Sequence, residues 1–274
     1  LVKRLLDEGR VVIAVDNFQR GNLRNYSDLN INIDCLNIDL TKSQLVNELF
    51  KEHKFESIFH LAARIGNIEY LHMNSDTELN TLNTNLLIDS NVIRACINHD
   101  IKKFVYSSSI SVYPIDLQEK IGSVFSEKDL TYVNPEGGYG WAKYIGEQQL
   151  SWLANTKVGI ARIFNVYGIG QNLYNLKQGM VSIYLAQMLK NQKIIVKGSP
   201  KRFRDFIYID DIVKIIGLLI NNNIAHGKIY NVGTGIKTTV QQVLNNMIKQ
   251  YGKNVKLEYS DPTPGDQLGI TADI

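Results

Sequence analysis

Short apolar runs alternate with helix-length segments along this chain, and that alternation constrains its fold more than any other feature. The apolar runs lie at 11–15, 35–39, 57–63, 104–107 and 158–164. Segments with recurring apolar positions follow several of them, at 40–51, 80–98 and 139–154. Apolar runs bounded by turn residues are typical of buried parallel strands, and strands that alternate with helices form doubly wound sheets. The sequence therefore predicts an α/β fold built on a doubly wound parallel sheet.

The second part of the chain follows a looser pattern from about residue 168. Helices are expected near 180–190, 209–221 and 238–251, with strands at 194–196 and 228–232. No flexible linker separates this part from the first. We therefore expect a first domain at 1–167 and a smaller lobe at 168–274. The lobe should interleave with the first domain and cover the carboxyl edge of the sheet, where ligands of such sheets bind.

Composition argues against several classes of function. The net charge of +3 is small and the basic residues are scattered, so no nucleic-acid partner is expected. With no CxxC or His-rich motif, Cys35 and Cys96 are expected to be reduced thiols, and no metal site is expected. No run approaches the ~18 apolar residues of a membrane span, and no signal-peptide pattern is present. We therefore expect a cytoplasmic protein without a membrane partner.

Tyr139 and Lys143 form the strongest chemical signal, because residues four apart lie on one face of a helix. A nearby ammonium favours the phenolate and so lowers the pKa of a tyrosine. Tyr139 would then act as general acid and base for a hydroxyl that is being oxidised. Such pairs also occur by chance on solvated helices, so this interpretation needs a second signal.

A run of serines, Ser107 to Ser109, provides that second signal. The run directly follows a predicted apolar strand. Hydroxyls at the carboxyl end of a strand lie in the ligand crevice of a doubly wound sheet. The alternative is a serine-rich turn that merely ends the strand. For Ser109, the presence of Tyr139 and Lys143 favours a functional role.

Together with these residues, the segments 59–63 (FHLAA) and 164–168 (FNVYG) resemble the extended short-chain dehydrogenase/reductase family. The resemblance runs along the whole chain, and members of that family have a Rossmann-like sheet and include nucleotide-sugar epimerases, dehydratases and decarboxylases. It implies NAD as the cofactor, a nucleotide sugar as the substrate, and Ser109, Tyr139 and Lys143 as the catalytic triad. Lys143 would also hold the nicotinamide ribose.

The same resemblance places cofactor-binding residues along the first domain. An acidic residue that ends the second strand of the pattern accepts hydrogen bonds from an adenosine ribose, so Asp16 favours NAD over NADP. Arg20 nearby could instead accept a 2′-phosphate. Asp39 also suits the N-cap of the helix that follows it. The cofactor positions that the resemblance implies are Asp16, Asn17, Asp39, Leu40, Leu61, Ala62, Ala63, Asn85, Ser107, Tyr139 and Lys143.

The family's glycine-rich phosphate loop is absent from this sequence. The resemblance places that loop between the family's first strand and the helical segment at 1–9, which begins here without a cap. We therefore expect the sequence to lack about one strand and one glycine loop before Leu1, and a final helix after Ile274.

Substrate positions lie mostly in the second part. Arg204 resembles the family's diphosphate-binding arginine, and a guanidinium suits bidentate phosphate contact. The alternative for Arg204 is a surface ion pair with Asp205 or Asp210. Thr263 stands where relatives often carry a basic residue, which departs from the usual recognition of uridine diphosphate. The implied substrate positions are Ser109, Ser111, Asn165, Arg204 and Asp266.

The residues after Ser109 discriminate among the family's reactions. Its 4,6-dehydratases carry an Asp-Glu pair there and its decarboxylases a Glu, whereas this chain has Ile110 and Ser111. GDP-sugar 3,5-epimerases, which segment 63–70 resembles, use a cysteine where Ser111 stands. A 4-ketoreductase or synthase would consume NAD(P)H. The resemblance therefore implies NAD-dependent 4-epimerisation through a transient 4-keto sugar, with these other activities as alternatives.

A homodimer is also implied, because relatives commonly pair through the helices that here carry Asn85 and Tyr139. Apolar residues recur on both helices, and core packing within one chain is the alternative for some of them. The positions considered for the interface are Leu82, Leu86, Val92, Ile93, Ile145 and Leu150.

Replacing Tyr139 by phenylalanine tests the central assignment. Tyr139→Phe should abolish turnover while NAD binding stays nearly intact, because the phenolic oxygen transfers the proton and the ring only packs. Loss of a general acid or base typically costs 10²–10⁴-fold in rate. Steady-state kinetics and NAD titration measure the two effects, and activity within about tenfold of wild type would refute the role.

Overall fold

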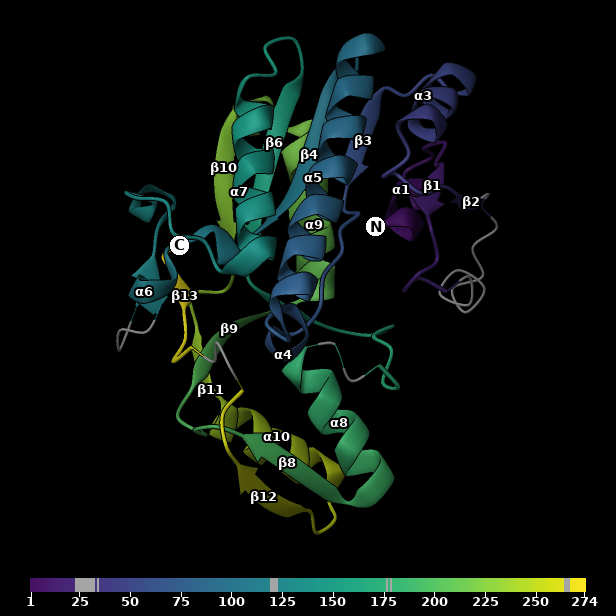
Figure 1. Cartoon of the computed structure of the whole chain (residues 1–274). Helices are drawn as coiled ribbons and strands as arrows, with labels where there is room; N and C mark the ends of the chain where they lie inside the picture. Colours follow the sequence, from purple (N-terminus) through teal and green to yellow (C-terminus); the bar gives the residue numbers. More distant parts are fainter. Residues whose placement is uncertain (23–32, 34, 119–122, 176, 178, 264–266) are drawn as a thin grey trace.

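A computed structural model of the chain describes residues 1–22, 33, 35–118, 123–175, 177, 179–263 and 267–274, and it centres on a four-stranded sheet (Figure 1). The strands follow the order β10-β6-β4-β3, and every neighbouring pair is parallel. Helices connect these strands, which confirms the predicted doubly wound α/β fold. Their bounds are β3 (Ser57–His60), β4 (Lys103–Ser109), β6 (Lys157–Ile163) and β10 (Lys228–Val232).

Helices cover both faces of this sheet (Figure 1). On one face, side chains of α3, α5 and α7 pack with Phe104 and Tyr106 of β4. On the other face, α9 packs against Val105 of β4 and Ala161 of β6. Neighbouring residues of β4 thus point to opposite faces, and both faces are buried, which explains why the strands are continuous apolar runs in the sequence. The helices are α3 (Ser43–Glu52), α5 (Ser75–Asn98), α7 (Gly137–Ser151) and α9 (Ile209–Asn221).

A separate parallel pair, β1 (Ala14–Asp16) with β2 (Cys35–Asn37), lies beyond β3 in Figure 1. In the described part of the chain, no hydrogen-bonded strand connects β1 to β3. Helix α1 (Val2–Asp7) is held against α9, because the Arg4 guanidinium donates to the carbonyl oxygen of Val213 at 3.2 Å. The strand expected before Leu1 stays a prediction.

The smaller lobe, in the lower part of Figure 1, has its own core around the buried side chains of Ile194, Val196 and Leu244. Two helices pack there against a parallel pair of strands. Because β10 and α9 return to the large sheet, the chain crosses between the two parts, and the division at residue 167 stays a prediction. The lobe elements are α8 (Met180–Asn191), β8 (Lys193–Lys197), α10 (Val240–Tyr251) and β12 (Lys256–Ser260).

Asp205 organises the connection between the two parts. It lies in β9, the middle strand of a three-stranded sheet ordered β11-β9-β7, and its side chain is fully buried. The carboxylate accepts hydrogen bonds from the backbone of Thr234 at 2.8 Å, Gly235 at 2.9 Å and Ala272 at 3.1 Å. Asp205 is therefore an internal acceptor and not a surface partner of Arg204. The strands are β7 (Asn165–Tyr167), β9 (Phe203–Tyr208) and β11 (Lys237–Thr239).

Short elements complete the described structure. Strand β5 (Val124–Phe125) pairs in parallel with β13 (Thr271–Ala272) near the C-terminal end. In the described ranges, no helix is both long and apolar enough to cross a membrane. The remaining helices are α4 (Ile68–Leu71), η1 (Ile110–Val112), α6 (Ile115–Gln118), η2 (Glu127–Asp129) and η3 (Asn223–Ala225).

Several element boundaries differ from the predicted ones. Helix α5 begins at Ser75 instead of residue 80, because the Asn74 side chain caps it by accepting a hydrogen bond from the backbone of Thr77. Helix α7 ends at Ser151 instead of residue 154. Strand β3 ends at His60, so the segment 61–63 leaves the sheet and is available at its carboxyl edge.

Candidate active site

Ser109, Tyr139 and Lys143 meet at the carboxyl end of β4. Ser109 is the last residue of that strand, and its hydroxyl hydrogen-bonds to Tyr139 of α7. Tyr139 and Lys143 are 7% and 1% exposed, and the Lys143 ammonium lies 5.9 Å from the centroid of the Tyr139 ring. The structure thus brings together the three residues that the resemblance assigns to catalysis, and it encloses them.

Burial dominates the acid-base behaviour of Tyr139. Desolvation raises the pKa of the phenol well above its ordinary value, and the nearby carboxylates of Asp89 and Glu136 raise it further, while the Ser109 hydrogen bond lowers it. The lowered pKa expected from the sequence is therefore wrong for this structure. The reason is that loss of hydration penalises the phenolate more than its polar neighbours stabilise it.

Lys143 experiences the same opposition between burial and charge. Desolvation lowers the pKa of its ammonium, and the carboxylates of Asp89 and Glu147 counteract that effect. The Lys143 ammonium lies 4.5 Å from the centroid of the Tyr106 ring, so its charge also contacts an aromatic face. Acidic residues that the sequence analysis did not identify therefore control the charge of this lysine.

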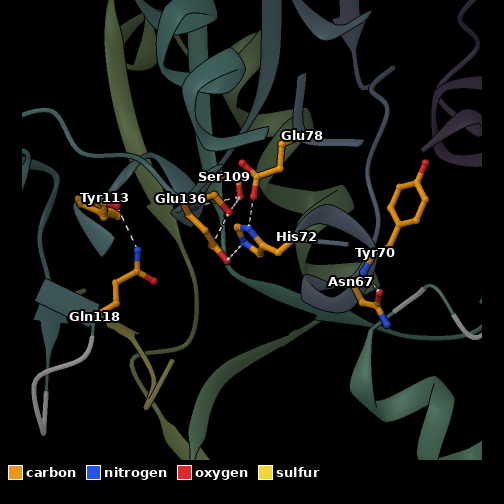
Figure 2. A network of polar contacts seen from close by, with 9 residues as sticks. Asn67, Tyr70, His72, Glu78, Ser109, Tyr113, Gln118 and Glu136 are labelled. Atoms are coloured by element: carbon orange, nitrogen blue, oxygen red, sulfur yellow. Dashed lines mark hydrogen bonds and ion pairs between the residues drawn. The ribbon is translucent and has the colours of Figure 1, made fainter. Parts of the chain in front are cut away.

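Glu136 and His72 form a second polar group at the site (Figure 2). The Ser111 hydroxyl donates to Glu136 at 3.2 Å and lies 3.3 Å from the Ser109 hydroxyl. The His72 ring lies 3.5 Å from Glu136 through Nε2 and 2.6 Å from Glu78 through Nδ1. These two carboxylates raise the pKa of His72 to about 9, so its imidazole is cationic at neutral pH.

Sequence reasoning missed this second group. The prediction was based on the two positions after Ser109, which carry no carboxylate. In the structure, Glu136 enters the site from the segment that precedes α7. A usable signal was the acidic residue three positions before Tyr139, because that segment must pass the end of β4. His72 offered no signal, since it reaches Glu136 from 64 residues away in sequence.

Two glycines set how closely α7 approaches these residues. A Cβ atom on Gly140 would lie 2.2 Å from the Ser111 carbonyl oxygen, and one on Gly138 would lie 2.2 Å from the Glu78 carbonyl oxygen. Both distances are far shorter than a carbon can tolerate, and both obstacles are backbone. Glycine at these positions therefore lets the first turns of α7 press Tyr139 against η1 and α5.

The expected cofactor positions fall into two groups. Asp16 and Asn17 lie at the end of β1, and Asp39 and Leu40 follow β2, so these four belong to the separate pair of strands. Leu61, Ala62, Ala63 and Ser107 lie at the carboxyl ends of β3 and β4, with Tyr139 and Lys143. In the structure, Asp16 accepts a hydrogen bond from the backbone of Phe18 at 2.7 Å, and Asp39 accepts one from Thr41 at 3.0 Å.

Asn85 is buried and uses both ends of its amide on one residue. Its oxygen accepts from the Arg64 backbone nitrogen at 2.7 Å, and its nitrogen donates to the Arg64 carbonyl at 3.0 Å. This pairing explains an asparagine inside α5, and it fixes the segment that directly follows Ala63. A direct contact between Asn85 and a cofactor stays a prediction.

The substrate positions of the second part lie at the junction with the lobe. The Asn165 side chain donates to the carbonyl of Asp205 at 3.4 Å. The Arg204 guanidinium donates to the carbonyl oxygens of Phe203 at 2.7 Å and Gln267 at 3.4 Å. Asp266 lies outside the described residues. In the part of the chain that the structure describes, no cluster of three or more His, Cys, Asp or Glu could hold a metal ion.

Comparison with known proteins agrees with this geometry. Residues 1–233 match the model of the NAD dependent epimerase/dehydratase family. The chain belongs to that family. It is 29% identical over 286 residues to a putative UDP-glucose 4-epimerase of Methanocaldococcus jannaschii, covering 100% of this chain and 85% of the relative. It is 28% identical over 227 residues to a dTDP-D-glucose 4,6-dehydratase of Dictyostelium discoideum, covering 77% of this chain and 48% of the relative.

The solved structure of an epimerase has the same fold as this chain. The UDP-glucose 4-epimerase of Thermotoga maritima, crystallised with UDP-glucose, superposes with a TM-score of 0.86 at 26% identity. The match covers 99% of this chain and 84% of that chain. The Rossmann-like α/β class and the membership in an NAD-dependent enzyme family are thereby confirmed.

The residues present fit NAD. Asp16 ends a parallel strand with an acceptor suited to ribose hydroxyls, and a Cβ on Gly21 would lie 2.6 Å from its carboxylate, so the chain folds closely around this acid. Among the cofactor positions at the ends of β3 and β4, Lys143 supplies a buried hydrogen-bond donor beside Tyr139. Asp16 and Lys143 would hold the adenosine ribose and the nicotinamide ribose.

The charge of His72 predicts how stability depends on pH. Its pKa is raised above the ordinary 6.5, so its ion pairs stabilise the fold fully below pH 6.5, and this contribution is lost as pH rises through about 9. The urea midpoint of the wild type should fall over that window more steeply than that of His72→Gln. His53→Gln, outside the network, is the control and should retain the wild-type slope. Parallel curves for wild type and His72→Gln would contradict the assignment.

Proposed function

We propose that this protein is a nucleotide-sugar 4-epimerase that works through a transient 4-keto sugar. The observation that carries the proposal is the enclosed group of Ser109, Tyr139 and Lys143 at the carboxyl end of β4. Relatives named as UDP-glucose 4-epimerases, which match nearly the whole chain, support the same reaction.

Each residue has a defined task in this reaction. Asp16 and Lys143 would hold NAD, which would supply reversible hydride transfer at C4 of the sugar and a positive charge close to the phenol. Tyr139 takes the proton of the 4-hydroxyl and gives it back, and Ser109 orients that hydroxyl through its hydrogen bond to Tyr139. Because burial raises the pKa of Tyr139, a cation beside the phenol is needed to bring its proton affinity into the working range.

We infer that the substrate is a uridine-diphosphate sugar, as the name of the Thermotoga maritima structure and its bound ligand suggest for a relative. Arg204 and Asn165 would contact the diphosphate from the junction with the lobe, and Ser111 would contact the sugar. Both hydrogen bonds that Arg204 donates to backbone carbonyls come from Nη1, and they hold the guanidinium at this junction. Asp266 is proposed to contact the substrate from the sequence resemblance alone.

A second candidate function rests on Glu136. Dehydratases and 3,5-epimerases need a group that moves a proton at the carbon next to the ketone, and the sequence analysis found none after Ser109. The structure places the Glu136 carboxylate 3.2 Å from the Ser111 hydroxyl, inside the same site. Dehydration or 3,5-epimerisation is therefore the alternative function. The similarity of this chain to a relative named as a 4,6-dehydratase also supports this alternative. A 4-ketoreductase or synthase is the remaining alternative.

Product analysis in deuterated water separates these reactions. Given UDP-glucose and catalytic NAD without added reductant, the enzyme should convert the sugar to its C4 epimer until equilibrium. No net reduced nicotinamide and no carbon-bound deuterium should accumulate, because the hydride returns without exchange with solvent. Deuterium at C3 or C5 would indicate the 3,5-epimerase. A 4-keto-6-deoxy product would indicate dehydration. Net consumption of NADH in a separate reaction with a 4-keto nucleotide sugar would indicate the reductase.

We also propose a homodimer and a cytoplasmic location. The structure corrects part of the expected interface, because Val92, Ile93 and Leu150 are buried in the core between the sheet and its helices. They are therefore unavailable to a second chain. Apolar side chains of α5 and α7 that remain exposed are Leu79, Leu87, Ile97 and Trp141, with Leu82, Leu86 and Ile145 half-buried.

Light scattering of a charge-introducing variant tests the dimer. Leu87 is 51% exposed on α5, and Leu87→Glu should convert a dimer into a monomer because a carboxylate would be buried between two apolar surfaces. Ile224→Glu, at a 70% exposed position in η3, introduces the same charge elsewhere and should leave the dimer intact. A wild-type monomer at micromolar concentration would overturn the proposal.

A further inference from the structure

The buried carboxylate of Asp89 acts on the pKa of both Tyr139 and Lys143, and it takes no direct part in the proposed reaction. It is 1% exposed in the middle of α5. One carboxylate oxygen lies 2.8 Å from Nε2 of His60, at the end of β3. The other accepts a hydrogen bond from the Tyr106 hydroxyl of β4 at 2.6 Å. A carboxylate held from both sides by buried groups has little freedom to move.

Helix α7 closes over this group. A Cβ atom on Gly146 would lie 2.3 Å from the Tyr106 hydroxyl and 2.8 Å from Asp89, so only glycine allows α7 to approach this closely. Lys143, one turn earlier on the same helix, places its ammonium 4.5 Å from the centroid of the Tyr106 ring. The ring of Tyr106 thus has the ammonium over its face and the carboxylate at its hydroxyl.

A buried ammonium requires a counter-charge, because an unpaired charge in the interior is very costly. Two carboxylates act on Lys143, those of Asp89 and Glu147. Glu147, however, is already paired with Arg162 through two hydrogen bonds, at 2.7 and 3.0 Å, and also accepts from Ser108. Asp89 carries no such arginine among its described contacts. Asp89 and the Lys143 ammonium both contact Tyr106, one at its hydroxyl and the other over its ring, and of the two carboxylates Asp89 acts more strongly on the charge of Lys143.

We propose that Asp89 is a positioning residue for the reaction: its carboxylate, fixed by His60 and Tyr106, is the buried counter-charge that holds the Lys143 ammonium beside Tyr139. The sequence offered no sign of this role, because the acid lies on a helix four residues after Asn85 and reaches Lys143 only through the packing of α5 on α7. The pH arm of the test below rests on the proposed 4-epimerase function.

The charge of Asp89 also acts on the proton affinity of the pair. It raises the pKa of Lys143 and that of Tyr139, while His60 and Lys143 keep its own pKa low despite burial. The ionisable groups that interact with it are His60 on β3, Tyr106 on β4, and Tyr139 and Lys143 on α7, while Glu147 on α7 acts on Tyr106 and Lys143. Removing the charge while keeping the shape should lower the pKa of both Lys143 and Tyr139.

The first experiment compares Asp89→Asn with Asp76→Asn, an isosteric change of equal charge at an exposed position of the same helix. With UDP-glucose and NAD as probes, the rising limb of kcat against pH should move to lower pH by about one unit in Asp89→Asn. Its kcat at neutral pH should fall by about tenfold or more, with KM changed less than about threefold. Asp76→Asn should match the wild type. An unshifted limb in a folded Asp89→Asn would refute the proposal.

The second experiment needs no activity and uses a double-mutant cycle in urea unfolding. If Asp89 balances Lys143, Asp89→Asn should lower the urea midpoint much less in a Lys143→Met background than in the wild type, because the double variant leaves neither charge unpaired. Equal decreases of the urea midpoint in both backgrounds would overturn the proposal. This holds even if Asp89→Asn alone folds poorly. Absence of UDP-glucose turnover in the wild type would refute the proposed function and leave this cycle interpretable.

Discussion

The packing of α7 against β4 and α5 is the constraint on which the rest of the site depends. Three glycines along that helix, Gly138, Gly140 and Gly146, stand where a side chain would strike backbone or buried polar atoms of the neighbouring elements. Their spacing lets the helix descend onto the end of β4 over three turns. Tyr139 and Lys143 lie between these glycines, so the same contact that brings them to Ser109 also removes them from water.

Because the site is enclosed, charged side chains in it lose hydration, and opposite charges nearby compensate for that loss. Three cations lie in or beside the enclosed region. Arg162 is paired with Glu147, His72 lies against Glu136 and Glu78, and Lys143 shares contact with Tyr106 with Asp89, whose charge acts on it. Such pairs are weak sources of stability, because desolvation offsets most of their attraction, but removing one partner is expensive. The pairs therefore specify one arrangement of α5, α7 and β4 more than they stabilise the fold.

The sequence was sufficient for features that follow from local pattern. Alternating apolar runs predicted the parallel sheet, and the spacing of Tyr139 and Lys143 predicted a shared face. It was insufficient where burial or distant contacts decide. The pKa of Tyr139 moved opposite to expectation because the depth of enclosure is a tertiary property. Val92 and Leu150 were placed at an interface although they face the core, since periodicity alone cannot tell one apolar environment from another. The pairing of the Asn85 amide with the Arg64 backbone could not be predicted either, because the two residues meet only in the folded chain.

Glu136 shows why reading a motif position by position misleads about reaction type. The absence of carboxylates at Ile110 and Ser111 argued against dehydration and decarboxylation, because the resemblance places the acids of those reactions at these positions. The site, however, is defined in space, and Glu136, directly before α7, brings a carboxylate to the Ser111 hydroxyl. What limits Glu136 as a carbon base is the use of both its oxygens. One oxygen accepts a hydrogen bond from the Ser111 hydroxyl at 3.2 Å, and the other lies 3.5 Å from Nε2 of His72. A carboxylate held in this way is better suited to orient the Ser111 and Ser109 hydroxyls than to remove a proton from carbon, and this favours hydride return over elimination.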